Sequence, residues 1–463
     1  MNKELPQGWV WTSLGEIISI EYGKGLTEDK RDKNGIYPVY GSSGIVGYHS
    51  NYFVEKNCII IGRKGAVGKV HLTNSPSWPI DTTYYTVPPK NISRVFLFFL
   101  LYYLRLDKLD KSTAIPGINR NDVYGKNIPL PPFAEQERIA NKIEELFTNL
   151  DKGIEYLKTA QTELNFTRQS VLKYAMEGKL TENWREENKG KIELASVLLE
   201  KIKDEGKDNI QRYKEMAHDN IKKYTDIPNS WLWVKLIQIS DNIKPGFPCG
   251  KHNREGKGVP HIRPMNIDIK GGINLSNIKY VNVEEYDSLK KGDVLFNNTN
   301  SSELLGKTTY IQIDTNWAYS NHMTRIRINN SIAKSEWISF YLHYLYISGF
   351  YQSICIHHVN QSSINSKVLS EKIPIPLPPI AEQKQIVEEI ETYYSILDNM
   401  ENTISQSLNQ TSGIRQSILK KAFEGRLVPQ DPNDEPASVL LERIKADKSK
   451  SEKEKISEKR TDS

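Results

Sequence analysis

The chain has 463 residues, and its 62 basic and 57 acidic side chains leave a net charge of +5. The length suggests about three domains. A hydrophobic content of 38% with 26% charged residues favours globular domains joined by solvated segments. The charge balance by itself only weakly favours a nucleic-acid ligand, so local clusters must carry any such signal.

The cysteine and hydropathy patterns exclude several classes of protein. Cys58, Cys249 and Cys355 are widely spaced and form no CxxC pair, which argues against disulfides and a thiolate zinc site and suits a reducing compartment. The N-terminus lacks the apolar core of a signal peptide. The most apolar stretch, 95–103, is far shorter than the roughly 20 residues that cross a bilayer. We expect a cytoplasmic protein without a membrane segment.

Residues 1–133 predict a first β-rich domain. It opens on the strand signal LPQGWVW at 5–11, continues with β-branched runs at 58–61 and 82–87, and ends in an aromatic, helix-like patch at 95–109. Basic side chains near its glycine-rich turns are candidate DNA contacts, because Arg and Lys bind phosphates or guanine edges: Lys24, Lys30, Arg31, Arg63, Lys64 and Lys69. Each of them alone is also explained as a solvated surface charge.

Residues 134–180 predict the first of two long helices. Pro131 and Pro132 mark its start and Gly178 its end. Apolar residues recur at spacings of three and four along its length, which indicates a coiled-coil seam. A helix of about 43 residues is roughly 65 Å long. The alternative is an ordinary bundle helix inside one core. A charged connector follows at 181–223, with a short helical signal at 194–203.

Residues 224–378 predict a second domain that begins like the first. The segment IPNSWLW at 227–233 matches the first opening at an offset of 222 residues, and strand signals follow at 293–296, 308–313 and 324–328. The sequences between the shared openings and endings look unrelated. We expect the four tryptophans of the two openings to be core residues rather than base-stacking platforms: Trp9, Trp11, Trp231 and Trp233.

The second domain also carries candidate DNA contacts on loops rich in glycine and asparagine. Asparagine adds the ability to pair with an adenine edge. The candidates are Lys251, His252, Arg254, Lys257, Arg263, Asn297, Asn298, Asn300 and Ser301.

Residues 379–427 repeat the first long helix at a constant offset of 247. When 130–180 is aligned with 377–427, 20 of the 51 positions are identical. Apolar stripes at the same phase predict that the two helices pair with each other, antiparallel. Repeated polar residues are candidates for scaffold or partner-docking roles, although plain helix packing would also repeat them: Glu135, Gln136, Arg168, Gln169, Glu382, Gln383, Arg415 and Gln416. Residues 428–463 predict a helix followed by a disordered, mixed-charge tail.

We find no catalytic or metal-binding pattern in the sequence. Residues 301–308 resemble a phosphate-binding loop, but Ser301 replaces its first glycine and the following residues favour a strand over the helix that such a loop needs. His357 and His358 are adjacent, so their side chains would point to opposite faces of a strand.

The repeated LPP-[FI]-AEQ and RQS-[VI]-LK motifs, together with the paired openings, resemble the specificity subunit of type I restriction–modification enzymes. The resemblance implies an α+β fold with two α/β target-recognition domains held apart by two long antiparallel coiled-coil helices. It implies that each domain reads one half of a split double-stranded DNA target, while the helices set the gap and dock modification subunits, two in number.

The same resemblance implies that this chain carries no cofactor of its own. S-adenosylmethionine would be bound by the modification subunits, and ATP with magnesium by the restriction subunits. Three other functions remain open from the residues alone: a scaffold with two domains for non-DNA ligands, a phosphotransferase using residues 301–308, and an RNA-binding protein.

Overall fold

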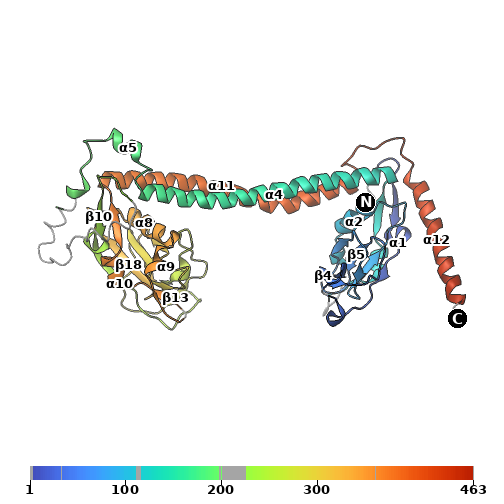
Figure 1. The fold of residues 1–463 in the computed structure, drawn as a ribbon, viewed down its shortest axis with the longest axis horizontal. Helices are drawn as coiled ribbons and strands as arrows, with labels where there is room; N and C mark the ends of the chain where they lie inside the picture. Colours follow the sequence, from blue (N-terminus) through green and yellow to red (C-terminus); the bar gives the residue numbers. More distant parts are fainter. Residues whose placement is uncertain are drawn as a thin grey trace. The chain divides into compact units, whose positions relative to one another are not determined.

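The computed structural model describes residues 4–32, 34–110, 116–197, 200, 226–359 and 361–461. The chain divides into two compact units, each of which we describe by itself: unit 1 joins residues 1–158 with 405–463, and unit 2 spans 159–404. Each unit combines a β-rich domain with segments of two long helices (Figure 1). Within the described ranges, no helix is long and apolar enough to cross a membrane.

Domain 1 is the part of unit 1 that precedes the first long helix. Its first and last strands pair antiparallel, with Val10 opposite Leu130. The strands are β1 (Val10–Ser13) with β9 (Asn127–Leu130), then a sheet in the order β2 (Glu21–Tyr22), β8 (Thr83–Thr86), β5 (Ile59–Gly62), β6 (Val70–Leu72), and another in the order β4 (Gly44–His49), β3 (Tyr37–Gly41), β7 (Trp78–Pro79). The helical elements are α1 (Leu14–Ile17), η1 (Glu28–Lys30), α2 (Arg94–Tyr103), η2 (Leu106–Leu109) and α3 (Arg120–Tyr124).

Domain 2 begins and ends in the same way, with Leu232 opposite Leu377. Its strands are β10 (Leu232–Lys235) with β21 (Pro374–Leu377), then the sheet β11 (Ser240–Pro245), β18 (Met323–Ile328), β14 (Asp293–Asn297), β16 (Thr308–Tyr310), the sheet β13 (Lys279–Val281), β12 (Val259–Ile262), β17 (Ala318–Tyr319), and the sheet β15 (Thr299–Asn300), β20 (Ser362–Ser363), β19 (Ile356–His357). The helical elements are η4 (Leu236–Gln238), η5 (Pro264–Asn266), α8 (Ser335–Ile347), α9 (Phe350–Ile354) and α10 (Ser366–Glu371).

The two domains share one topology, although their interior sequences look unrelated. The four-stranded sheets connect in the same sequence order, and the sheets β4-β3-β7 and β13-β12-β17 each combine one antiparallel with one parallel pair. Domain 2 adds the small sheet β15-β20-β19, in which both pairs are antiparallel. Equivalent backbone hydrogen bonds recur: Gly23 N–H donates to Thr83 and Gly246 N–H to Met323. Backbone bonds of this kind do not depend on side-chain identity, which explains how the sequences can differ while the topology is kept.

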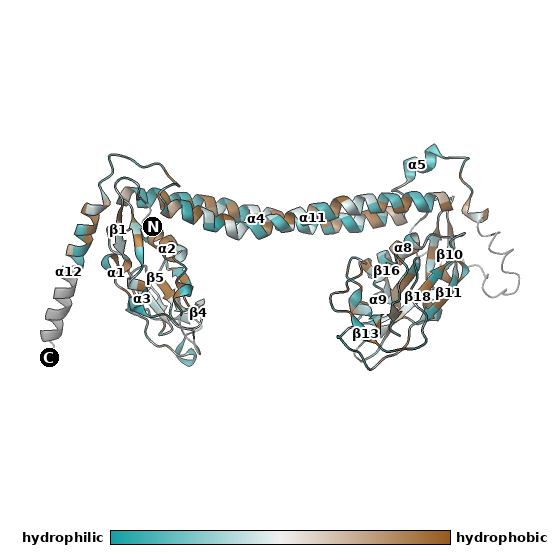
Figure 2. Ribbon diagram, turned by 180° about the vertical axis from the view of Figure 1, so that it is seen from behind, coloured by the Kyte–Doolittle hydropathy of each residue, from teal (hydrophilic) through white to brown (hydrophobic). Residues whose placement is uncertain are grey.

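Each domain has an apolar core on which one helix packs. In domain 1, Phe96 and Leu100 of α2 are fully buried, and in domain 2 Trp337 and Leu342 of α8 are. Apolar residues, brown in Figure 2, lie along α2 and β5, while the long helices show brown and teal residues in alternation. The periodicity of the long helices therefore reflects an amphipathic, not an all-round apolar, surface.

The long helices are α4 (Phe133–Met176) and α11 (Ile380–Phe423), each of 44 residues. Both end as predicted at a glycine with positive φ: Gly178 at 70° and Gly425 at 67°. In unit 1 the first part of α4 packs on the last part of α11, and in unit 2 the last part of α4 packs on the first part of α11. The helices are therefore packed together antiparallel, which confirms the α+β fold class with its internal repeat.

Two expectations differ from the structure. Helix α12 (Ala437–Thr461) extends through most of the tail that the charge pattern predicted to be disordered. Its Lys- and Glu-rich sequence has good helix propensity, which explains the helix. Trp9 and Trp231 are buried as predicted, but Trp11 is 42% exposed because it faces away from the core on β1. Trp233 is half-buried. Helix α5 (Glu182–Glu187) lies in the predicted connector. Of the helical signal at 194–203, residues 195–197 are helical, whereas 198–199 and 201–225 lie outside the described residues.

Candidate nucleic-acid interface

The candidate basic residues of the two domains lie on loops at equivalent places in the shared topology. We call residues 23–35 and 246–258 the entry loops. The first connects β2 to β3 in domain 1, and the second connects β11 to β12 in domain 2. Each begins at a glycine that lies against backbone: an added Cβ would come within 2.1 Å of the Ile80 oxygen at Gly23 and of the Tyr319 oxygen at Gly246. The entry loops hold Lys24, Lys30, Arg31, Lys251, His252, Arg254 and Lys257.

The second equivalent pair follows the central strands β5 and β14. We call residues 62–69 and 297–307 the glycine–lysine loops, because each ends in Gly-Lys. In domain 1, Gly68 N–H donates to the Gly62 carbonyl and Gly62 N–H to Lys69; in domain 2, Gly306 N–H donates to Asn297 and Asn297 N–H to Lys307. The loops hold Arg63, Lys64, Lys69, Asn297, Asn298, Asn300 and Ser301. The structure thus pairs candidates that the sequence alone did not align.

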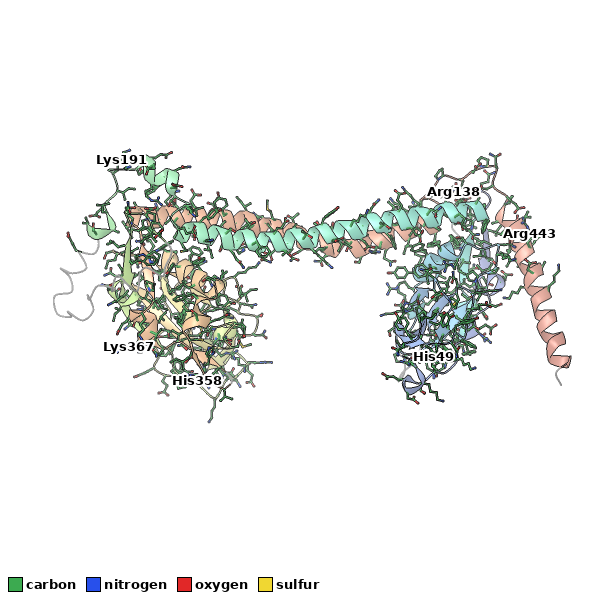
Figure 3. All side chains as sticks on the ribbon, viewed as in Figure 1. His49, Arg138, Lys191, His358, Lys367 and Arg443 are labelled. Carbon is green, nitrogen blue, oxygen red and sulfur yellow. The ribbon has the colours of Figure 1, made fainter. Side chains whose placement is uncertain are left out.

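In domain 1 most candidate side chains are accessible to a ligand. Lys24, Lys30, Lys64 and Lys69 are exposed. The Lys24 ammonium lies 5.7 Å from the Phe53 ring and 5.8 Å from the Trp78 ring. Arg31 differs, because its guanidinium donates to the backbone carbonyls of Val46 and Leu26 and so holds the entry loop. In Figure 3, His49, which stacks edge-on against Trp78, lies at the end of the domain remote from α4.

In domain 2 some candidate side chains are buried and hydrogen-bonded within the domain, whereas others are accessible to a ligand. Asn297 and Asn298 are buried: the Asn297 amide donates to the Leu304 carbonyl, and the Asn298 amide donates to Asn321 and Thr324. These two side chains are used inside the domain. Lys251, Arg254, Lys257 and Ser301 are exposed, and His252, Arg263 and Asn300 are half-buried.

The half-buried candidates of domain 2 meet at one cavity of about 670 Å³. It joins the entry loop to the glycine–lysine loop and to the turn before β18, and its lining includes His252, Arg263, Asn300, Lys307, Asn321 and His322. The Lys307 ammonium, however, donates to the carbonyls of Pro264 and Ile267 and is 5% exposed. The cavity therefore presents amide, imidazole and guanidinium groups beside apolar walls.

Burial and neighbouring charge lower the pKa of two imidazoles in this region, those of His252 and His261. His252 Nε2 lies 3.0 Å from His261 Nδ1. Burial, with a smaller effect of His252, lowers the pKa of His261 to about 4. Burial, with Arg263 and Lys279, also lowers the pKa of His252. At neutral pH the pair can accept and donate hydrogen bonds but adds no charge.

Sequence reasoning missed several residues that the fold brings to these loops. Tyr22 and Arg120 lie beside Arg63 in domain 1, and Met265, Asn321 and His322 line the cavity in domain 2. One sequence signal could have helped, an Ile-Asn pair that precedes a short helix in each domain, at 118–119 and at 364–365. In the structure Ile118 N–H donates to Arg63 and Ile364 N–H to Asn298. The two pairs are 246 residues apart and not 247, so the offset of the long helices does not align them.

The candidate scaffold residues at the start of each long helix are buried. Glu135 accepts a hydrogen bond from Trp9 Nε1, and Glu382 accepts one from Trp231 Nε1, both at 2.9 Å. Gln136 accepts from the Ser93 backbone at the start of α2, and Gln383 accepts from the Lys334 backbone at the start of α8. Each motif therefore ties the domain opening and the domain helix to the long helix.

The candidates near the ends of the long helices form a reciprocal pattern. Arg168 bonds Asp398 at 2.5 Å and stacks 4.4 Å from the Tyr394 ring. Arg415 bonds Asp151 and stacks 4.8 Å from the Phe147 ring. Arg415, Asp398 and Tyr394 lie 247 residues after Arg168, Asp151 and Phe147. The arginine of each long helix therefore contacts the same two repeat positions on the other helix. Gln169 is exposed and Gln416 half-buried.

With this geometry in place, the chain can be compared with known proteins. The family model of the type I restriction modification DNA specificity domain matches it twice, at residues 6–165 and 228–410. These matches cover most of the chain, which therefore belongs to this family. Its function is DNA specificity in a type I restriction–modification system, as a non-catalytic subunit of the enzyme.

Relatives agree with this assignment, and solved structures share the fold. The specificity subunit of the type I restriction enzyme EcoDI of Escherichia coli is 25% identical, with 99% of both chains covered. That of EcoKI from Escherichia coli K12 is 26% identical over 78% of this chain and 72% of its own. The HsdS subunit of Thermoanaerobacter tengcongensis has a similar fold, with a TM-score of 0.58 at 20% identity, covering 92% of this chain and 99% of its own. A chain from a study of type I complex assembly gives a TM-score of 0.62 at 21% identity, covering 92% and 100%.

Proposed function

We propose that each domain reads one half of a bipartite double-stranded DNA target and that the paired helices set the gap between the halves. Domain 1 (1–133) and domain 2 (224–378) act as target-recognition domains, joined by the long helices (134–180 and 379–427), the connector (181–223) and the C-terminal segment (428–463). The observation that carries the proposal is the shared topology, which presents chemically different loops at equivalent positions. Two similar probes with different side chains suit a target with two different halves.

In this proposal the cationic loop residues contact phosphates. Lys251, Arg254 and Lys257 are exposed on the entry loop of domain 2, as Lys24 and Lys30 are on that of domain 1. Alanine in place of Lys251, Arg254 and Lys257 together should weaken binding in a salt-dependent way, with a shallower slope of affinity against salt. An affinity loss that does not change with salt would reject these side chains as phosphate contacts.

Family membership supports our proposal for the remaining partners. The chain works in the cytoplasm with modification subunits, two in the full complex, which bind S-adenosylmethionine, and with restriction subunits, which bind ATP and magnesium. Since Glu135, Gln136, Glu382 and Gln383 are buried within this chain, docking falls to accessible groups of the helices such as Gln169 and Gln416.

A pair of insertions tests the gap. Four residues inserted after Lys158 and four before Ser405, inside both long helices, add about 6 Å. That length corresponds to roughly two base pairs. Mapping of methylated adenines in cells that carry the partner subunits should show a longer gap with both half-targets unchanged. The matched control places four residues between Pro432 and Asn433, outside both helices, and should leave the gap unchanged. Altered half-targets with an unchanged gap would contradict the proposal.

A further inference from the structure

The Arg63 side chain is the best-prepared hydrogen-bond donor on the glycine–lysine loop of domain 1. Its guanidinium lies 5.2 Å from the ring of Tyr22 and 5.8 Å from that of Tyr84. Among the described residues, no carbonyl or carboxylate accepts a hydrogen bond from it. An arginine held by rings keeps its planar fork of donors free for a ligand.

The backbone beneath Arg63 is fixed on both sides. Its N–H donates to the Thr82 carbonyl, and its own carbonyl accepts from Ile118. The next residue, Lys64, also donates to Thr82 and forms an isolated bridge with Gly117. The loop is closed by Gly68, where an added Cβ would come within 2.1 Å of the Asp107 nitrogen. The side chain therefore starts from a backbone position that cannot easily move.

The surroundings of Arg63 suit a base edge more than a phosphate alone. Tyr22 is 49% exposed and also carries the guanidinium of Arg120 on its ring, 5.3 Å away. Lys64 and Lys69 follow Arg63 on the same loop and are exposed, so flexible ammonium groups are already available for the phosphates. A planar fork of donors held against rings, on a loop that also carries flexible cations, matches bidentate pairing with the O6 and N7 atoms of guanine.

The residue at the equivalent position of domain 2, Asn298, cannot contact a base edge in the way proposed for Arg63. Asn298 has the same backbone bonds as Arg63, because its N–H donates to His322 and its carbonyl accepts from Ile364. Its side chain, however, is buried and bonded within the domain. In domain 2 the accessible groups are instead those of the cavity, such as Asn300 and Asn321.

We infer that Arg63 is a specificity-determining residue of domain 1 that recognises the guanine of one G·C base pair in the half-target of this domain. This inference rests on the proposed function, since it requires domain 1 to read duplex DNA. Domain 2 has Asn298 at the equivalent position, so this contact is made in one half of the target only.

The test uses the full chain assembled with its modification subunits and a library of duplexes with randomised half-targets. The wild-type complex should prefer guanine at one position of the half read by domain 1. Arg63→Ala and Arg63→Lys should lower affinity for that target about 10- to 100-fold and remove the preference at this position only. The second half-target should be unchanged, and thermal unfolding of the Lys variant should match the wild type.

Lys64→Ala is the matched control on the same loop. It should lower affinity for all sequences by a similar factor and reduce the salt slope without changing the preferred bases. If Arg63→Ala keeps the wild-type preference at every position, the inference is overturned while the proposed function stands. If the wild-type complex shows no preference for any sequence, both are overturned.

Discussion

Domain 1 and domain 2 have the same backbone arrangement but use it with different side chains. The glycine–lysine loop of domain 1 exposes Lys64 and supports the guanidinium of Arg63 on rings, whereas that of domain 2 turns Asn297 and Asn298 inward. The cations of domain 2 are concentrated on its entry loop instead. The difference teaches that topology fixes where a residue stands in such a domain, while local side-chain packing decides whether it can meet a ligand.

The attachment of each domain to its long helix shows a second difference. Glu382 accepts from Trp231, Thr181 and Arg185, with the Arg185 guanidinium 2.8 Å away. Glu135 accepts from Trp9 but pairs with no cation among the described residues, because Arg138 pairs with Asp434. Burial accordingly raises the pKa of Glu135. Glu382, which holds domain 2 through Trp231, is thus also part of a buried ion pair with Arg185 of α5, whereas Glu135 holds domain 1 through a neutral donor.

The largest expected effect tests this difference. Glu382→Ala removes the acceptor of Trp231 and Thr181 and leaves the Arg185 guanidinium with the Gly178 carbonyl but no counter-charge. It should lower the free energy of unfolding by about 3–5 kcal/mol. Glu135→Ala removes the acceptor of the Trp9 N–H but breaks no ion pair, and should cost about 1–3 kcal/mol. Urea unfolding followed by tryptophan fluorescence measures both.

Glu137→Ala is the control for this pair, since Glu137 is exposed on α4 one residue after the buried motif. It should change stability by less than about 0.5 kcal/mol. Equal losses for Glu382→Ala and Glu135→Ala would show that the ion pair with Arg185 adds nothing to the attachment of domain 2.

Acid pH should distinguish the two units next. Unit 2 contains two buried histidines, His261 and His343, and burial lowers the pKa of each to about 4. An unfolded histidine titrates near 6.5, so between pH 6.5 and 4 the unfolded chain binds more protons than the folded one. The stabilisation is complete above about pH 6.5 and is lost as the pH falls, by roughly 2 kcal/mol per histidine at pH 5.

Unfolding midpoints at a series of pH values from 8 to 5 measure this loss. His343→Gln, which keeps an acceptor for the Thr308 N–H, should flatten the dependence. His49→Gln, a half-buried histidine of unit 1, should keep the wild-type slope. A His343→Gln slope equal to that of the wild type would show that His343 is not the titrating group.

The sequence predicted the long helices well, because their signals are local and repeated. Proline pairs and Gly178 or Gly425 mark the ends, and Arg168 and Asp151 recur at one offset. The sequence did not predict that the entry loops and the glycine–lysine loops of the two domains are equivalent. Matching backbone hydrogen bonds define this equivalence, and few side chains are shared between the loops. Nor could burial of Asn297 be predicted, since the acceptor of its amide comes from the far side of its loop.

Two glycines test the shared topology directly. Gly23→Ala and Gly246→Ala each place a Cβ within 2.1 Å of a backbone oxygen, so each should cost about 1–3 kcal/mol through forced backbone shifts. Gly25→Ala and Gly250→Ala, on the same entry loops, have open space and should have little effect. Circular dichroism melting curves measure the loss of stability. A clear loss for Gly23→Ala with none for Gly246→Ala would show that the two entry loops are not equivalent.

The smallest expected effect concerns the reciprocal pairs of the long helices. Arg168 is nearly buried, with 10% of its side chain exposed, whereas Arg415 retains 26%. Because solvent weakens an ion pair, the coupling energy between Arg168 and Asp398 should be about 1 kcal/mol, and that between Arg415 and Asp151 about 0.5 kcal/mol. Double-mutant cycles with alanine at each position measure these couplings by urea unfolding. Raising the salt concentration should reduce the second coupling more than the first, since the more exposed pair is better screened. If the coupling between Arg415 and Asp151 were larger than that between Arg168 and Asp398, the rings of Tyr394 and Phe147, and not the carboxylates, would hold the two arginines in place.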